Sequence, residues 1–338
     1  MPLGETVDAW SASRRCSTPP SCTPSVRFSH QPLVFKAEGF YRQQLKRLEN
    51  RTHRDDRRLT MKSQLIAIVA AVLLVGVVRV IAETKPKVLL MHTPDGIEFG
   101  IWGSTKRELP APTLIVLATT IQDTLNSAYY RHCGNQLAKR GFLCVSINLP
   151  CHGDQRVEGE PEGLSGWSHR AARDLDFVAE FNNRLSKVLD HLVKQGLSDP
   201  EKIAACGTSR GGFLALHAAI HDPRVKCVAG FAPVTDLSAL SEFKLTSKYQ
   251  LVKKYNLINR ANDLAGRKVW IIIGDQDKRV DTDNAVQLAR EISKESRKKK
   301  LPSRVTLHVL PEPRGHTIPA GADRMAADWI LQEINLDQ

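Results

Sequence analysis

The chain has 338 residues, of which 42% are hydrophobic and 25% are charged. These proportions are those of an ordinary globular protein and exclude a wholly disordered or fibrous chain. The formal net charge of +12 would suit an anionic partner, but residues 83–338 hold 35 Lys and Arg against 30 Asp and Glu, so this excess is diffuse and argues against a nucleic-acid partner.

Two segments precede the predicted folded domain. Residues 1–60 are rich in Ser, Pro, Thr and Arg, which predicts a disordered tail. Residues 61–82 then read as a secretory signal peptide: Lys62 is a positive flank, 65–78 are uncharged and almost wholly apolar, and Ala82 is a small terminal residue. This apolar core is shorter than the ~20 residues that a membrane span needs.

This layout predicts that translation begins at Met61 and that residues 1–60 are not part of the protein. The alternative is a real cytoplasmic tail followed by an uncleaved membrane anchor at 65–78. In the first case the protein is secreted or periplasmic, and in the second it is membrane-anchored. Both interpretations place residues 83–338 outside the cytoplasm, and an anchor at 65–78 is the only membrane contact that we expect.

From residue 83 onward, short apolar runs alternate with longer amphipathic ones. The turn signal Pro94-Asp95-Gly96 predicts a hairpin. Strands are predicted at Val88–His92, Glu98–Trp102, Thr113–Ala118, Phe142–Leu149, Ile203–Cys206, Val225–Gly230, Val269–Gly274 and Arg304–Leu310. Helices are predicted at Ser127–Arg140, His169–Gln195, Gly211–Ile220, Thr282–Ser296 and Pro319–Ile334.

This order predicts one α/β domain over 83–338, with a mostly parallel sheet and helices on both faces. Residues 233–266 interrupt the alternation, since they are polar and rich in Lys and Tyr. They follow the carboxyl end of a strand, where such folds build their sites. We therefore expect a small cap insertion at about 233–266.

The residues Gly207-Thr208-Ser209-Arg210-Gly211 form a G-x-S-x-G pattern between a predicted strand and a predicted helix. The turn is so tight that the positions two before and two after the serine must lack side chains. It lifts the Ser209 hydroxyl above the sheet and places it at a helix N-terminus, which favours developing negative charge. Ser209 is therefore the candidate nucleophile, whereas a plain turn serine is the structural alternative.

A serine hydroxyl needs a base to take its proton. His316 follows the last predicted strand in Pro313-Arg314-Gly315-His316, which makes it the candidate base. Asp277 follows an earlier strand and is the candidate acid that orients the histidine, with Asp275 after the same strand as the alternative. The chain order Ser, Asp, His is the order expected for this arrangement.

These three residues, each after its own strand, resemble the triad of the α/β-hydrolase superfamily. The stretch Gly207–Gly212 and the G-x-x-D-x-x-V run at Gly274–Val280 are similar to its prolyl-oligopeptidase-like and dienelactone-hydrolase-like branches. The resemblance covers roughly Val88–Ile334. It implies an α/β-hydrolase fold and an acyl-enzyme mechanism.

The resemblance also implies an oxyanion hole made of backbone N–H groups. Arg210 supplies one, and the loop after the Thr113–Ala118 strand supplies the other, from Thr120 or, alternatively, Thr119. The His-Gly pair that many relatives carry there is absent. His152, in a Gly-His-Gly-like loop, is expected to be structural. Whether the Arg210 side chain points at substrate or pairs with an acid is left open by the sequence.

These observations predict a serine carboxylesterase that cleaves small or medium esters. The resemblance to prolyl oligopeptidases supports a peptidase of short substrates instead, although only about 90 residues precede the hydrolase core, too few for the propeller of those enzymes. A catalytically silent binding protein is the third possibility, against which the intact triad argues. The seven cysteines suit no zinc site, and no G-x-G-x-x-G follows the first strand, so we expect no metal and no cofactor.

Overall fold

The computed structural model describes residues 88–103 and 108–335, all within one compact unit, Ala82–Gln338. The predicted tail over 1–60 and the predicted signal peptide over 61–82 lie outside the described residues, so the location outside the cytoplasm stays a prediction. In the part of the chain that the structure describes, no helix is both long enough and apolar enough to cross a membrane.

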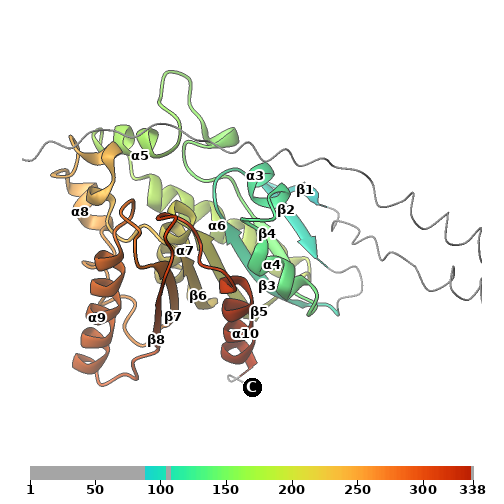
Figure 1. The fold of residues 1–338 in the computed structure, drawn as a ribbon. Helices are drawn as coiled ribbons and strands as arrows, with labels where there is room; N and C mark the ends of the chain where they lie inside the picture. Colours follow the sequence, from blue (N-terminus) through green and yellow to red (C-terminus); the bar gives the residue numbers. More distant parts are fainter. Residues whose placement is uncertain (1–87, 104–107, 336–338) are drawn as a thin grey trace, which may run out of the picture. The chain divides into compact units, whose positions relative to one another are not determined.

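An eight-stranded sheet forms the centre of the molecule, in the order β1-β2-β4-β3-β5-β6-β7-β8 (Figure 1). The strands are β1 Leu89–His92, β2 Glu98–Gly103, β3 Ala111–Leu117, β4 Leu143–Ser146, β5 Ser198–Thr208, β6 Val225–Phe231, β7 Lys268–Gly274 and β8 Val305–Leu310. β1 and β2 pair antiparallel, as does β2 with β4, and every other pairing is parallel. The predicted hairpin and mostly parallel sheet are therefore confirmed.

Both faces of the sheet are covered by helices because the central strands are apolar on both sides. Ile115 and Leu117 of β3 pack into the same core as α6, α7 and α9, whereas Leu114 and Val116 pack into the core that holds α4 and α10. The helices are α3 Ile121–Asn126, α4 His132–Ala138, α5 Gly163–Ala171, α6 Phe177–Lys194, α7 Arg210–His221, α8 Gln250–Tyr255, α9 Thr282–Lys298 and α10 Ala322–Asn335.

Two predicted helices were wrong in extent. The prediction over Ser127–Arg140 covers a turn followed by α4, and that over His169–Gln195 covers the end of α5, a break at 172–176, and α6. At this break Asp174 has φ = +56°, and Asp176 caps α6 by accepting the N–H of Ala179 at 3.0 Å. Tyr129 and Leu175 keep the helical spacing of apolar residues through these two turns, so the hydrophobic pattern alone did not reveal them.

The segment 233–266 contains the short helices η2 Leu237–Ala239, η3 Ser241–Phe243 and α8. Several of its apolar side chains are buried in the same core as α6 and α7, namely Leu237, Leu240, Phe243, Leu251, Leu257 and Leu264. The segment is thus packed onto the domain along much of its length. Its half-buried Glu242 borders the larger of the two cavities described below.

The turn from β5 into α7 depends on a glycine. A Cβ at Gly211 would overlap the backbone carbonyl of Leu117 in β3, although alanine is otherwise the best helix former. We expect Gly211→Ala to lower the thermal midpoint by about 10 °C or more, because neither the backbone of α7 nor that of β3 can move without disturbing its own hydrogen bonds. The measurement is thermal unfolding followed by circular dichroism.

Gly196→Ala is the matched control for this substitution. Gly196 has φ = +67°, but nothing lies within 4 Å of the added Cβ. Backbone strain is then the main cost, which lowers the free energy of unfolding by about 1 kcal/mol and the thermal midpoint by about 2–4 °C. Equal losses in the two variants would contradict a steric role for Gly211.

Candidate active site

Ser209 stands between β5 and α7 with a strained backbone. Its dihedral angles are φ = +54° and ψ = −117°, a region that residues with a side chain rarely adopt. The Ser209 N–H donates to the Phe231 carbonyl at 2.9 Å, which ties the turn to β6. A Cβ at Gly207 would overlap the Gly211 carbonyl, so the two glycines make the close turn possible.

The structure brings Ser209, Asp277 and His316 together. The His316 Nε2 atom lies 3.0 Å from Ser209 Oγ, and its Nδ1 atom lies 2.7 Å from Asp277 Oδ2. The carboxylate only accepts, so Nδ1 carries the proton and Nε2 presents its lone pair to the hydroxyl. The three residues follow β5, β7 and β8, whose carboxyl ends meet at one edge of the sheet.

Asp277 is held as a buried carboxylate. It is 2% exposed, and its Oδ1 atom accepts the N–H groups of Arg279 at 3.0 Å and Val280 at 3.2 Å. Burial by itself would raise the pKa of Asp277, but the hydrogen bond from His316 and these two backbone groups outweigh it. The pKa of Asp277 therefore lies below its ordinary value of 3.8, and the group is ionised at neutral pH.

Asp275, the alternative acid, has a different partner. It is exposed, and its Oδ1 atom accepts the N–H of Glu312 at 2.8 Å. This bond joins the end of β7 to the loop that carries His316. The carboxylate in contact with the histidine ring is that of Asp277 alone among the described residues.

Two adjoining cavities open at this edge. The smaller, about 180 Å³, is lined by Ser209 and His316, and also by Thr119, Tyr129 and Tyr130. The larger, about 510 Å³, shares Thr119 and Arg210 with it and extends along residues 151–165 to Glu242 of the insertion. Within residues 88–103 and 108–335, no group of three His, Cys, Asp or Glu side chains is arranged to hold a metal ion.

Of the candidate oxyanion donors, Arg210 and Thr119 line both cavities, whereas Thr120 lines the larger one. Arg210 is the first residue of α7 and follows Ser209 directly. Thr120 caps α3, its Oγ1 atom accepting the Asp123 N–H at 2.9 Å, and its own N–H has no acceptor among the described residues. Thr119 lines the cavity at Ser209, but its N–H donates to Thr124 Oγ1 at 3.4 Å.

Sequence reasoning missed Tyr129 and Tyr130, which it placed inside a helix. In the structure they lie in the turn before α4, and the Tyr129 hydroxyl accepts the Ile318 N–H at 3.1 Å, which ties this turn to the loop of His316. No signal in the sequence marks them, because the turn itself was not predicted. Trp167 is fully buried and donates to the Pro150 carbonyl, so it packs a helix and lines neither cavity.

The family is settled by comparison with known proteins. The model of the prolyl oligopeptidase family matches residues 135–332, more than half of the chain, and the matched range includes Ser209, Asp277 and His316. The chain therefore belongs to the prolyl oligopeptidase family. The resemblance read from the motifs is confirmed.

One curated relative is a hydrolase. The chain is 28% identical over 127 residues to the 20-hydroxy-prefusarin hydrolase FUS2 of Gibberella moniliformis (strain M3125 / FGSC 7600). This match covers 37% of the present chain and 28% of the relative, so the chain spans less than a third of that protein.

Solved structures show the same fold in both esterases and peptidases. The AtxE2 isopeptidase with bound Astexin3-dC4 superposes with a TM-score of 0.57 at 18% identity, covering 75% of this chain and 41% of that one. A cold-adapted esterase from an Arctic intertidal metagenomic library superposes with a TM-score of 0.52 at 16% identity, covering 73% of this chain and 93% of that one. These similarities establish the α/β-hydrolase fold, as predicted.

Because Asp277 alone contacts His316, the two aspartates should differ sharply in mutagenesis. We expect Asp277→Asn to lower kcat for hydrolysis by about 10³- to 10⁴-fold, since an amide stabilises the wrong tautomer of the histidine. Asp275→Asn is the matched control and should lower kcat by less than about tenfold, because it loosens only the loop. The measurement is steady-state hydrolysis of an activated ester, and similar losses in both variants would contradict the assignment.

Proposed function

We propose that the chain is a serine carboxylesterase that cleaves small or medium esters through an acyl-enzyme. The observation that supports this most strongly is the continuous hydrogen-bonded chain from Ser209 Oγ through His316 to Asp277. Each member comes from a different strand end, and the serine is held in a strained turn that exposes its hydroxyl. A plain turn serine would need neither feature.

In the proposed reaction, Ser209 Oγ attacks the ester carbonyl carbon while His316 Nε2 takes the hydroxyl proton. The ionised Asp277 holds the ring tautomer and stabilises the imidazolium that forms. His316 then gives the proton to the leaving alcohol as the carbon–oxygen bond breaks. Water attacks the acyl-enzyme by the same route, which releases the acid and restores Ser209.

The negative charge on the carbonyl oxygen requires two N–H donors. We assign these to the backbone N–H groups of Arg210 and Thr120. Arg210 lies at the N-terminus of α7, where the helix dipole also favours an anion. In the part of the chain that the structure describes, the Thr120 N–H has no acceptor, which supports Thr120, whereas the lining of the cavity at Ser209 supports Thr119.

The size of the cavity supports an ester over a peptide as the substrate. About 180 Å³ at Ser209 suits a short acyl group and is smaller than the ~300–1,000 Å³ of typical small-molecule sites. The alternative is a peptidase, which membership of the prolyl oligopeptidase family and the likeness to the AtxE2 isopeptidase support. A short peptide would then extend into the cavity of about 510 Å³.

The first test compares the two substrate classes directly. We expect the wild type to hydrolyse p-nitrophenyl acetate and butyrate much faster than a prolyl p-nitroanilide. Ser209→Ala should lower kcat by at least about 10⁴-fold, because the nucleophile is lost. Turnover of the anilide alone would replace the esterase proposal with the peptidase, and an inactive wild type that no fluorophosphonate labels at Ser209 would overturn both.

A second test isolates the oxyanion donor. Thr120→Pro removes the backbone N–H at a residue whose φ of −85° is close to that of proline, and Thr120→Ala removes only the helix cap. We expect the proline variant to have a kcat about 10²- to 10³-fold below that of the alanine variant. If the two variants react equally fast, the donor is Thr119 instead.

A further inference from the structure

The Arg210 side chain lies where the two cavities meet, and it has an unusual partner. Its Nη1 atom is 3.0 Å from His152 Nε2. The guanidinium is partly buried, and no carboxylate within hydrogen-bond distance of it occurs in the described part of the chain. The sequence left open whether this side chain pairs with an acid, and the structure shows that it pairs with a histidine.

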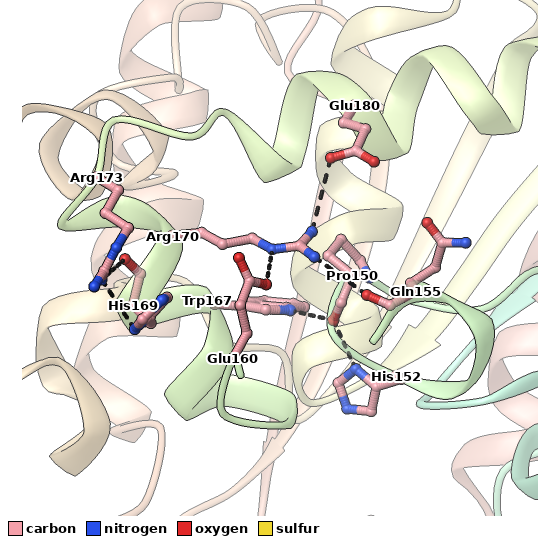
Figure 2. A network of polar contacts seen from close by, with 9 residues as sticks. All are labelled: Pro150, His152, Gln155, Glu160, Trp167, His169, Arg170, Arg173 and Glu180. Atoms are coloured by element: carbon pink, nitrogen blue, oxygen red, sulfur yellow. Dashed lines mark hydrogen bonds and ion pairs between the residues drawn. The ribbon is translucent and has the colours of Figure 1, made fainter. Parts of the chain in front are cut away.

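That histidine is neutral. The His152 Nδ1 atom lies 2.8 Å from the Pro150 carbonyl, which can only accept, so Nδ1 carries the proton and Nε2 accepts from Arg210 (Figure 2 shows His152 and Pro150). Burial also lowers the pKa of His152, which favours the neutral ring. The ring therefore satisfies one N–H of the guanidinium and leaves its charge uncompensated.

The acidic side chains around the larger cavity have partners of their own. Glu242 pairs with Arg279, and Glu162 pairs with Arg156. Asp123 accepts the Thr119 hydroxyl at 3.2 Å and has no hydrogen bond to Arg210. Burial lowers the pKa of Arg210, and the nearby charge of Glu242, which is already paired with Arg279, does not offset this loss of water.

The space beside the guanidinium is kept open and rigid. Gly163, the first residue of α5, has φ = +60°, and a Cβ there would lie 3.1 Å from Arg210 Nη1. The N-terminal turn of α5 borders the same cavity, and its dipole adds positive potential. A bulkier residue at position 163 would crowd the charged group.

A buried network holds the wall of this cavity in place. Arg170, 6% exposed, bonds Glu160 at 2.8 Å and the Gln155 carbonyl at 3.2 Å, so it pins the loop that carries His152 (Figure 2). Trp167 donates to the same Pro150 carbonyl as His152, at 2.7 Å. The partner of Arg210 is thus positioned before any ligand arrives.

We propose that the cavity of about 510 Å³ binds a carboxylate of the substrate and that the Arg210 guanidinium is its partner. This rests on the proposed function, since the carboxylate belongs to the ester that Ser209 cleaves. The guanidinium has four N–H groups left after His152, enough to bind a carboxylate through two parallel bonds. The substrates are then esters with a free acid on either the acyl or the alcohol part.

The test compares charged and neutral esters of similar length, using the full chain. The pairs are 3-acetoxybenzoate with 3-acetoxybenzamide, and monomethyl adipate with methyl hexanoate, which place the acid on the alcohol and acyl parts respectively. We expect the wild type to prefer the anion in one pair. In Arg210→Gln, which retains the backbone N–H, the ratio of kcat/KM values for that pair should fall by about 10- to 100-fold.

Arg173→Gln is the matched control, because Arg173 is an exposed guanidinium of the turn after α5 that bonds His169 outside the cavities (Figure 2). Its ratio should stay within about twofold of the wild type, since exposed charges at a distance contribute little. If the wild type prefers neither anion, the proposal is overturned. It is also overturned if Arg210→Gln slows charged and neutral esters by the same factor, because the guanidinium would then act on the reacting carbonyl.

A binding measurement separates this inference from the proposed function. In Ser209→Ala, calorimetry should show 3-acetamidobenzoate binding more tightly than 3-acetamidobenzamide. Adding Arg210→Gln should weaken the binding of the anion by about 10- to 100-fold. This result needs no turnover, so it holds even if the esterase proposal fails. Where the wild type prefers 3-acetoxybenzoate, equal binding of anion and amide would refute the carboxylate site while leaving the nucleophile untouched.

Discussion

The whole site depends on how closely α7 approaches the sheet at the end of β5. Gly207 and Gly211 leave no side chain at the two points of closest backbone approach, and the backbone of β3 touches the helix where the Cβ of residue 211 would otherwise lie. This contact forces Ser209 into the left-handed region and lifts its hydroxyl above the strand ends. The strain persists because the Ser209 N–H is anchored to β6 and α7 is buried in the core.

Around that rigid point, the other groups sit on loops that are tied to one another. The carboxylate of Asp275, after β7, binds the backbone of the loop that follows β8. The Tyr129 hydroxyl, from the segment between β3 and β4, binds the backbone of the same loop. His316 therefore meets Ser209 and Asp277 although all three lie far apart in the chain. Parallel strands make this possible, because their carboxyl ends face the same edge.

The charges near the nucleophile divide the site into two parts. Beside Ser209, the buried carboxylate of Asp277 faces the histidine. On the other side, a neutral histidine holds Arg210, while Glu162 and Glu242 are paired with other arginines. One residue thus serves both parts in the proposed mechanism: its backbone faces the reacting oxygen, and its side chain faces the rest of the substrate.

The sequence by itself determined the sheet, the alternation of helices and the three residues that meet, because glycine spacing and strand-end positions are local signals. It did not place the turns before α4 and α6, where Tyr129 and Leu175 keep the helical spacing of apolar residues. The choice between Asp277 and Asp275, the partner of Arg210 and the role of Tyr129 were decided only by the tertiary structure. Each depends on the direction of a side chain between elements distant in sequence, which periodicity does not encode.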